Sequence, residues 1–390
     1  MMETGRILHL VASSRGGGAV HVQTLTAALA RLGHAVTTVM PLDGGHVEPD
    51  DFERSGVRFV ALPPPPHSTI RRITDVARIL RDEAPLLVHA HGSRAAFWAF
   101  GALRWARLAH VHLIYSVHGY VTPAYRAPRR ILQGMMERRI ARRSSAVVAV
   151  ARAEYEALLE AGMAPPEKIF TVLYGIDAGA FARPSGAARA DARRRLGASM
   201  NSFVVLIVCR LDRPRDFHTL LHGFRRVVGA FPHAKLFVVG GGPLRGRIEG
   251  LVDELKLGTS VTLWGSRMDV NCFYRSADAF VLTSDGWEGL PISVLEAQAA
   301  SLPVVVTDVG GSREAIKPDQ TGLLVPPRDP RALGSALLHL AQDPARAAAM
   351  GEQGRRFVGQ QFKIDAMARR IAAIYEARLE ASGGQSPSRP

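Results

Sequence analysis

The sequence predicts an α/β protein with two doubly wound domains that face a cleft, and three observations support this. The chain has 390 residues, and a single hydrophobic core rarely supports a chain of that length, so two domains are expected. Short β-branched runs alternate with helical patterns, as in parallel sheets covered by helices on both faces. The alternation stops between Ala182 and Asn201 and then starts again. Residues 1–181 are therefore expected to form one domain, residues 182–201 a linker and residues 202–362 a second domain.

The first half contains alternating strand and helix candidates. The strand candidates are Ile7–Ala12, Ala35–Met40, Val57–Leu62, Leu86–Ala90, Val111–Val117, Ala146–Val150 and Ile169–Leu173. The helix candidates are Ala19–Leu32, Thr69–Asp82, Ala95–Arg107, Arg129–Arg142 and Ala153–Ala161. This βαβ order predicts a parallel sheet.

The second half repeats the pattern. Its strand candidates are Val204–Cys209, Lys235–Val239, Val261–Trp264, Ala279–Thr283, Val304–Thr307 and Leu323–Val325. Its helix candidates are Phe217–Ala230, Leu244–Leu257, a helix opening at Pro291, Pro330–Gln342, Pro344–Gly359 and Ile364–Ala381. Residues 382–390 are polar, with Gly and Pro, and are expected to be a disordered tail.

Composition and charge narrow the class of protein. Two cysteines give no disulfide framework, and the N-terminal residues lack the features of a signal peptide, so a cytoplasmic location is expected. No run reaches the roughly 18 apolar residues of a membrane span. The net charge is +14, and between Val60 and Arg152 there are 15 Arg against 4 acidic residues. Anionic lipid, an anionic lipid-linked acceptor or nucleic acid could each use this cationic region.

Two carboxylates lie around the helix expected to open at Pro291. Glu288 precedes the helix and Glu296 lies within it. A helix N-terminus attracts phosphate, so acids there need another partner, and sugar hydroxyls are good donors to carboxylates. This pairing indicates a ligand that carries both phosphate and sugar.

Basic residues and glycines follow the strands of the second half. Arg210 and Arg215 suit a diphosphate because Arg binds phosphate in a fork, although solvated arginine is the plainer interpretation. Gly241 lies in a glycine run that either approaches a nucleotide closely or makes a tight turn. The sequence has no Asp-x-Asp pair to clamp a metal on the diphosphate, so no metal is expected.

Glycine and histidine mark the corresponding strand ends of the first half. Gly16, Gly17 and Gly18 open the first helix, where they bring backbone close to phosphate or simply form a turn. His91 and His118 end two strands and could bind a sugar hydroxyl, or could be ordinary surface or core histidines. His89 alternates with His91 and carries a weaker signal.

These motifs together resemble the retaining family 4 glycosyltransferases, which have the GT-B fold of two Rossmann-like domains. The family pattern is matched by Glu288-Gly289-Leu290-Pro291 through Glu296-Ala297, in which the two Glu lie eight residues apart. The run Pro303–Gly311 and the segment Gly322–Val325 match as well. The segments His89–Ser93 and His118–Tyr120 are most similar to members that build surface polysaccharides.

The resemblance implies a role for each matching residue. Glu288 would contact the donor sugar, with Gly289, Leu290 and Pro291 beside it, and Glu296 would bind the ribose. Arg210 and Arg215 would hold the diphosphate. Gly17 would offer a backbone N–H to phosphate, and His118 would face the donor sugar. The helix 363–381 would pack back on the N-terminal domain.

The expected activity is metal-independent transfer of a sugar, with retention, from a nucleotide-sugar to a glycan or lipid-linked acceptor. Two departures from the family pattern concern Arg215, where Lys is usual, and Tyr174, where Asn is usual. The alternatives are a non-hydrolysing nucleotide-sugar epimerase of the same fold and a basic membrane- or nucleic-acid-binding protein. No aromatic-interleaved basic motif favours nucleic acid. The segment Arg126–Arg143 either contacts the inner face of an anionic membrane or is a helix with a solvated Arg face.

Overall fold

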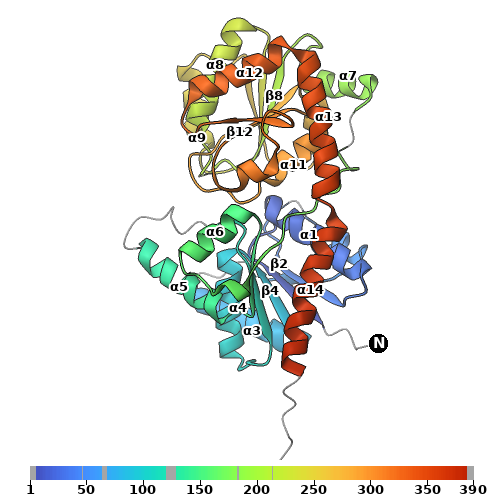
Figure 1. Ribbon diagram of the computed structural model, residues 1–390, viewed down its shortest axis with the longest axis vertical. Helices are drawn as coiled ribbons and strands as arrows, with labels where there is room; N and C mark the ends of the chain where they lie inside the picture. Colours follow the sequence, from blue (N-terminus) through green and yellow to red (C-terminus); the bar gives the residue numbers. More distant parts are fainter. Residues whose placement is uncertain are drawn as a thin grey trace, which may run out of the picture. The chain divides into compact units, whose positions relative to one another are not determined.

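The computed structural model describes residues 6–45, 47–63, 68–119, 129–181, 184–212 and 214–383. The chain divides into two units: unit 1 comprises residues up to Gly175 together with those from Ile364 onward, and unit 2 comprises Ile176–Lys363. Each unit is a parallel sheet flanked by helices (Figure 1). This confirms the predicted fold class of two doubly wound α/β domains.

Unit 1 has a seven-stranded sheet in the order β3-β2-β1-β4-β5-β6-β7. Its strands are β1 (Ile7–Val11), β2 (Val36–Pro41), β3 (Arg58–Leu62), β4 (Leu87–His91), β5 (His112–Ser116), β6 (Ala146–Ala149) and β7 (Ile169–Thr171). Its helices are α1 (Gly17–Arg31), α2 (Pro49–Glu53), α3 (Thr69–Glu83), α4 (Gly92–Trp105), α5 (Arg129–Arg143), α6 (Arg152–Glu160) and α14 (Ile364–Gly383). Figure 1 shows α1 and α14 on one face of the sheet and α3 and α4 on the other.

The C-terminal helix α14 belongs to unit 1. Its Met367, Ile371 and Tyr375 lie in one buried cluster with Val22 and Leu29 of α1. Burying each large apolar side chain of such a stripe stabilises the fold by ~1.5–3 kcal/mol. The predicted tail continues beyond α14, and its residues 384–390 lie outside the described part of the chain.

Unit 2 has a six-stranded sheet in the order β10-β9-β8-β11-β12-β13. Its strands are β8 (Val204–Val208), β9 (Lys235–Val239), β10 (Val261–Gly265), β11 (Ala279–Leu282), β12 (Val304–Thr307) and β13 (Gly322–Val325). Its helices are α7 (Gly186–Arg195), α8 (Phe217–Ala230), α9 (Arg245–Glu254), α10 (Val270–Ser276), α11 (Ile292–Ala299), α12 (Pro330–Gln342) and α13 (Pro344–Gln361).

The strand order locates the ligand-binding end of each sheet. It reverses direction at β1/β4 in unit 1 and at β8/β11 in unit 2. In doubly wound sheets, ligands bind outside the carboxyl ends of the strands at such switch points. The loop after β1 ends at Gly16 and α1 opens with Gly17 and Gly18, the loop after β8 carries Arg210, and the loop after β11 carries Glu288.

The predicted linker 182–201 is wrong, because this range falls within unit 2 and residues 186–195, half of it, form α7. The helix is fixed by Arg193, whose side chain is only 2% exposed and donates to the carbonyl oxygens of Ser199, Met200, Ser202 and Ser276. Arg193 also pairs with the carboxylate of Asp278. The unit boundary falls at Gly175/Ile176 instead of after residue 181, and Ala182 and Arg183 lie outside the described part.

Candidate active site

The carboxylate of Glu288 lies in a small buried cluster in unit 2. Arg215 forms an isolated bridge to Ser284, the second residue after β11, and its Nη1 donates to Ser284 Oγ over 2.7 Å. The same Nη1 pairs with Glu288 Oε1, and Ser284 Oγ donates to that oxygen over 2.8 Å. Glu288 is 8% exposed. The cation and the carboxylate that the sequence assigned to separate tasks are therefore paired with each other.

The backbone around Glu288 is fixed by the glycines that follow β12. Gly311 N–H donates to the carbonyl oxygen of Glu288 over 3.0 Å. Gly310 has φ +48°, and a Cβ at this position would collide with that carbonyl oxygen. Only glycine tolerates both conditions easily, so Gly310 and Gly311 keep the Glu288 loop in place.

The residues between the two carboxylates join the loop to α11. Pro291 is the N-cap residue, with ψ 105°, and the helix begins at Ile292, one residue later than predicted. Leu290 is 3% exposed and packs into the core. Gly289 lies half-buried between Leu290 and Glu288. The buried side chain of Leu290 therefore anchors the turn, and only the backbone of Leu290 can face a ligand.

Glu296 is half-buried in α11 and accepts a hydrogen bond from Tyr274 Oη over 2.7 Å. Burial raises the pKa of this carboxyl group from 4.5 to about 7, and the Tyr274 hydrogen bond opposes that rise only in part. The group is thus poised between its charged and neutral forms near neutral pH, and hydroxyl donors from a ligand would favour the carboxylate.

This pKa makes a testable prediction. We expect nucleotide binding at pH 7 to release about half a proton, because ribose hydroxyls would stabilise the charged Glu296. Calorimetric titration with nucleoside diphosphate in two buffers of different ionisation enthalpy measures that release. Glu296→Gln should abolish the release and weaken donor binding. Equal proton release in both proteins would contradict the assignment of Glu296 to the ribose.

The same pKa affects stability with a definite sign. The folded protein holds this proton more tightly than the unfolded chain does, since the folded pKa is the higher one. The contribution of Glu296 to the free energy of unfolding therefore falls as pH rises from 4.5 to about 7. Glu296→Gln should remove that contribution.

Arg210 lies beyond the end of β8 and is exposed. Its Nη2 donates to Asp212 Oδ2 over 2.6 Å. An exposed guanidinium in a surface ion pair can turn toward a phosphate at little cost in free energy, because such pairs contribute little stability. Arg210 can therefore turn toward a ligand, whereas the Arg215 guanidinium is held in one place by Glu288 and Ser284. Arg213, between them, lies outside the described residues.

The glycine run after β9 interlocks with this loop. Leu211 N–H donates to the Gly241 carbonyl over 2.9 Å, and a Cβ at Gly240, whose φ is +139°, would collide with the Cys209 carbonyl. Close packing of the two loops therefore requires glycine at position 240. A nucleotide contact by the Gly241 backbone stays a prediction.

In unit 1, the glycine turn precedes α1 as predicted. Gly16 is the N-cap residue with φ +79°, and the helix begins at Gly17. A Cβ at Gly18 would have no atom within 4 Å, so the helix start is open on that side. The loop is held by Asp43, which accepts hydrogen bonds from Ser14 N–H and from Ser13 Oγ. Sequence reasoning did not identify Asp43.

His118 lies just after β5 with a left-handed φ of +56°. The buried carboxylate of Glu154 supports this turn by accepting from Gly119 N–H over 2.6 Å. Both ring nitrogens of His118 have partners: Nε2 lies 2.8 Å from His91 Nδ1, and Nδ1 lies 2.7 Å from Tyr174 Oη. Burial lowers the pKa of His118 to about 4, so the ring is neutral at pH 7.

His118 belongs to a cluster of histidines that the sequence did not predict. The cluster comprises His9, His21, His89, His91 and His118. The sequence indicates His91 and His118 and, more weakly, His89, whereas no motif points to His9 or His21. The signal lies in topology, since β1 is paired with β4 and β4 with β5.

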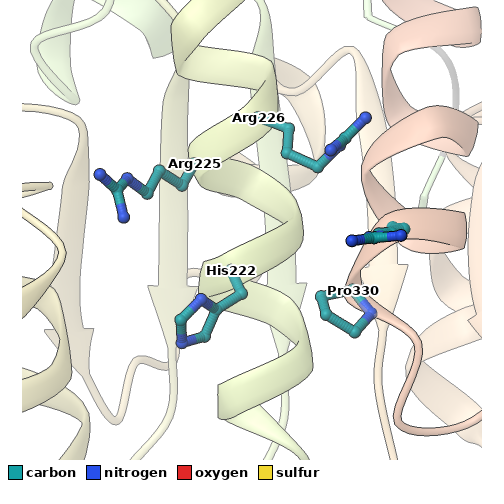
Figure 2. A pocket seen from close by; sticks show the side chains of 5 residues that line it. His222, Arg225, Arg226 and Pro330 are labelled. Atoms are coloured by element: carbon teal, nitrogen blue, oxygen red, sulfur yellow. The ribbon is translucent and has the colours of Figure 1, made fainter.

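A shallow hollow elsewhere in unit 2 does not coincide with these residues. His222, Arg225 and Arg226 of α8 line it together with Pro330 and Arg331 of α12. Figure 2 shows Arg225 and Arg226 extending to opposite sides of α8. Exposed arginines that point away from each other in this way do not form a preorganised anion-binding site.

Two family models match the chain. The model described as a glycosyl transferase 4-like domain matches residues 16–175, within unit 1, and the model described as glycosyl transferases group 1 matches residues 188–357, within unit 2. D-inositol 3-phosphate glycosyltransferase of Kineococcus radiotolerans is 30% identical over 321 residues, which are 75% of this chain and 72% of that protein. A GDP-mannose-dependent alpha-(1-6)-phosphatidylinositol monomannoside mannosyltransferase of Mycobacterium tuberculosis is 32% identical over 206 residues, 51% of this chain and 53% of that protein.

Solved structures share the fold. Anabaena HepE in complex with UDP and glucose has a TM-score of 0.82 at 20% identity, covering 96% of this chain and 100% of that chain. Sucrose-phosphate synthase from Thermosynechococcus elongatus has a TM-score of 0.81 at 24% identity, covering 97% of this chain and 100% of that chain. At these identities the likeness shows the two-domain α/β architecture.

Proposed function

Because this chain belongs to the group 1 glycosyltransferases, we propose that it moves a sugar from a nucleotide-sugar donor to a glycan or lipid-linked acceptor, retaining anomeric configuration without a metal ion. The observation that carries this proposal is the arrangement of Glu288 and Glu296 around the start of α11, with Arg215 paired to Glu288. Family membership argues against the epimerase and against a protein that only binds membrane or nucleic acid.

The Arg215–Glu288 pair explains how a carboxylate can lie where phosphate is expected. A lone carboxylate would repel a diphosphate, but one that is paired with a guanidinium presents little net charge. The Glu288 oxygens can then accept donor-sugar hydroxyls while Arg215 faces the developing charge on the leaving diphosphate. Arg210, exposed at the neighbouring strand end, supplies a second cation.

Charge compensation by these two arginines supports metal-independent chemistry. The diphosphate leaving group gains negative charge as the glycosidic bond breaks, and preorganised guanidinium groups stabilise that charge without a reorganisation step. The leaving phosphate then lies beside the acceptor hydroxyl and can take its proton, as front-face retention requires. Glu296 holds the ribose end of the donor.

The relatives suggest which acceptors to test first. One is named for D-inositol 3-phosphate and another for a phosphatidylinositol monomannoside, so both a soluble inositol phosphate and a glycolipid belong in the panel. HepE was solved with UDP, and the mannosyltransferase is named for GDP-mannose, which suggests UDP- and GDP-sugars as donors. Surface-polysaccharide or glycolipid synthesis in the cytoplasm is the proposed setting.

The experiment incubates the protein with UDP- and GDP-sugars, with and without these acceptors, and measures released nucleoside diphosphate. We expect acceptor-dependent release from at least one donor, unchanged by EDTA. Loss of activity with EDTA and its recovery with a divalent cation would contradict metal independence. Conversion of the donor to an isomeric nucleotide-sugar would contradict transfer.

Helix α5 supports a peripheral contact with anionic membrane. Ile131, Leu132 and Met135 are exposed to 61%, 70% and 65%, and Arg139 and Arg143 continue the same side of the helix. Exposed apolar side chains next to arginines are typical of helices that lie on anionic lipid. In the residues that are described, no helix is both long and apolar enough to cross a membrane. Arg126 lies outside those residues.

Two other arginines of α5 have structural contacts. Arg138 donates to the Ala161 carbonyl over 2.8 Å, and Arg142 to the Gly162 carbonyl over 3.3 Å, both at the end of α6. A membrane test should therefore leave Arg138 and Arg142 intact and change only Arg139 and Arg143.

We expect Arg139→Gln/Arg143→Gln to lower binding to phosphatidylglycerol vesicles about 30-fold, since each arginine near an anionic surface contributes about 1 kcal/mol. Cosedimentation measures the binding, with phosphatidylcholine vesicles as the uncharged reference. The matched control is Arg369→Gln/Arg370→Gln, which removes two exposed arginines of α14. Equal binding by both double variants would contradict a specific role for α5.

A further inference from the structure

The histidine cluster of unit 1 contains a continuous line of hydrogen bonds, called here the histidine chain. In order, it runs through Ser116, His89, Tyr375, His9, His91, His118 and Tyr174. Its members come from β1, β4, β5, the segment after β7 and α14. His91 and Ser116 are the last residues of β4 and β5, and His9 and His89 lie within β1 and β4. His118, which the sequence linked to the donor sugar, follows β5.

The outer part of the chain surrounds His118. His91 Nδ1 lies 2.8 Å from His118 Nε2, and His91 Nε2 lies 2.9 Å from His9 Nδ1. On its other side, His118 Nδ1 lies 2.7 Å from Tyr174 Oη. Tyr174 is 6% exposed and His91 also 6%. The imidazole of His118 is therefore held at both nitrogens by buried groups.

The inner part connects these rings to α14. Tyr375 Oη lies 3.4 Å from His9 Nε2 and 2.5 Å from His89 Nδ1. His89 Nε2 lies 2.7 Å from Ser116 Oγ. His9 and His89 are 0% exposed and Tyr375 is 1% exposed. Burial lowers the pKa of His9 to about 3, so these rings remain neutral at physiological pH.

A neutral imidazole has one N–H donor and one acceptor nitrogen. Along the chain, each ring uses Nδ1 toward one neighbour and Nε2 toward the other, in the same sense. If one ring carries its proton on Nε2, its neighbour must accept at Nδ1 and carry its own proton on Nε2. The tautomers of His9, His91 and His118 are therefore coupled directly, and that of His89 is coupled to them through the Tyr375 hydroxyl, which accepts from one ring and donates to the other.

We propose that His91 and Tyr174 are positioning residues that hold His118 as a neutral imidazole of fixed orientation, and that all four histidines of the chain share one tautomer. The role of His118 beside the donor sugar rests on the proposed function, but the shared tautomer does not. Tyr174 occupies the position where Asn is usual in the resembled family, so this end of the chain is a particular feature of this sequence.

A metal ion is the rival occupant of the same cluster. Nitrogen atoms of His9, His89 and His91, and of His21, His91 and His118, lie close enough to bind one ion. A metal would need lone pairs that the chain already uses in hydrogen bonds, and the buried trio offers no carboxylate to offset the charge. The hydrogen-bonded arrangement satisfies each nitrogen of the chain without an ion.

The test is NMR of the full chain labelled with ¹⁵N-histidine, with signals assigned by single substitutions. Ring ¹⁵N shifts distinguish protonated from unprotonated nitrogens. We expect His9, His89, His91 and His118 to show the same tautomer, unchanged between pH 6 and pH 8. One ring with the opposite tautomer, or a charged ring in this range, would overturn the proposal, as would stoichiometric transition metal in the purified protein.

An activity arm tests the positioning role. Tyr174→Phe keeps the ring and removes the hydroxyl, so His118 loses its partner at Nδ1. We expect kcat to fall about tenfold with a KM for the donor changed less than twofold, and the ¹⁵N signals of His118 to move toward averaged values. Unchanged kcat together with unchanged His118 signals would overturn the role of Tyr174.

His9→Phe removes the two ring nitrogens that bond to His91 and Tyr375, and should also perturb the His118 signals. His112→Asn, on β5 but bonded to Ser145 instead, is the control and should leave those signals in place. If Tyr174→Phe does not fold, the effect of His9→Phe on the His118 signals still tests whether the chain holds His118. If no donor is turned over at all, the proposed function fails, while the shared tautomer is still measured.

Discussion

Replacing Glu288 with Gln should lower kcat about 100-fold or more, with little change in affinity for the nucleotide. The substitution keeps the shape of the side chain but removes the charge that pairs with Arg215. Arg215 would then lose the ionic partner that holds its guanidinium in place, and the charged oxygen beside the donor sugar would be replaced by a weaker amide acceptor. Both effects act at the reacting sugar, whereas the ribose contact by Glu296 remains.

Asp285→Asn is the matched control for this experiment. Asp285 lies in the same loop, and its carboxylate pairs with Arg328 at 3.6 Å. It should therefore change kcat less than about threefold. Steady-state kinetics and nucleotide titration of both variants separate turnover from binding. If Glu288→Gln kept most of its turnover but lost nucleotide affinity, while Glu296→Gln did the reverse, the roles of the two carboxylates would be exchanged.

Replacing Arg193 with Ala should lower the free energy of unfolding of unit 2 by about 3–5 kcal/mol. The substitution leaves Asp278 without its buried partner and several loop carbonyls without a donor. Unsatisfied buried groups each cost about 1–3 kcal/mol, and Arg189 can still offset part of the charge on Asp278. Chemical denaturation measures the loss.

Arg194→Ala is its control, one residue further along α7. Arg194 is exposed and pairs with Asp191 on the same helix, an ion pair that contributes little. We expect a change below about 0.5 kcal/mol. Equal destabilisation by the two variants would mean that α7 is held by its helical propensity and not by the buried guanidinium.

Arg193 also shows why part of the fold could not be predicted. Helix α7 has an Ala/Arg-rich sequence without an apolar stripe, so its periodicity resembles that of a solvated linker. It is anchored by the buried side chain of Arg193, whose charge is offset by Asp278 and whose N–H groups donate to four backbone carbonyls. Central strands such as β8, β11 and β12 were predictable because each is a short apolar run whose residues are nearly all buried.

The candidate site divides in the same way. Glu288 and Glu296 could be predicted because they lie eight residues apart in one continuous segment, the loop before α11 and the helix itself. The pairing of Glu288 with Arg215 could not, since it depends on a bridge between the loops after β8 and β11. The histidine chain joins residues up to 366 positions apart, and only the strand order brings His9 next to His89.

We propose that unit 2 binds a nucleotide-sugar through Glu288, Glu296 and the arginines, and that the enzyme transfers the sugar with retention. The most direct measurement follows the anomeric proton by ¹H NMR during a reaction with the best donor and acceptor. We predict a glycosidic product with the anomeric configuration of the donor, formed in step with nucleoside diphosphate and almost absent with Glu288→Gln. An inverted product, or full turnover by Glu288→Gln, would contradict the account.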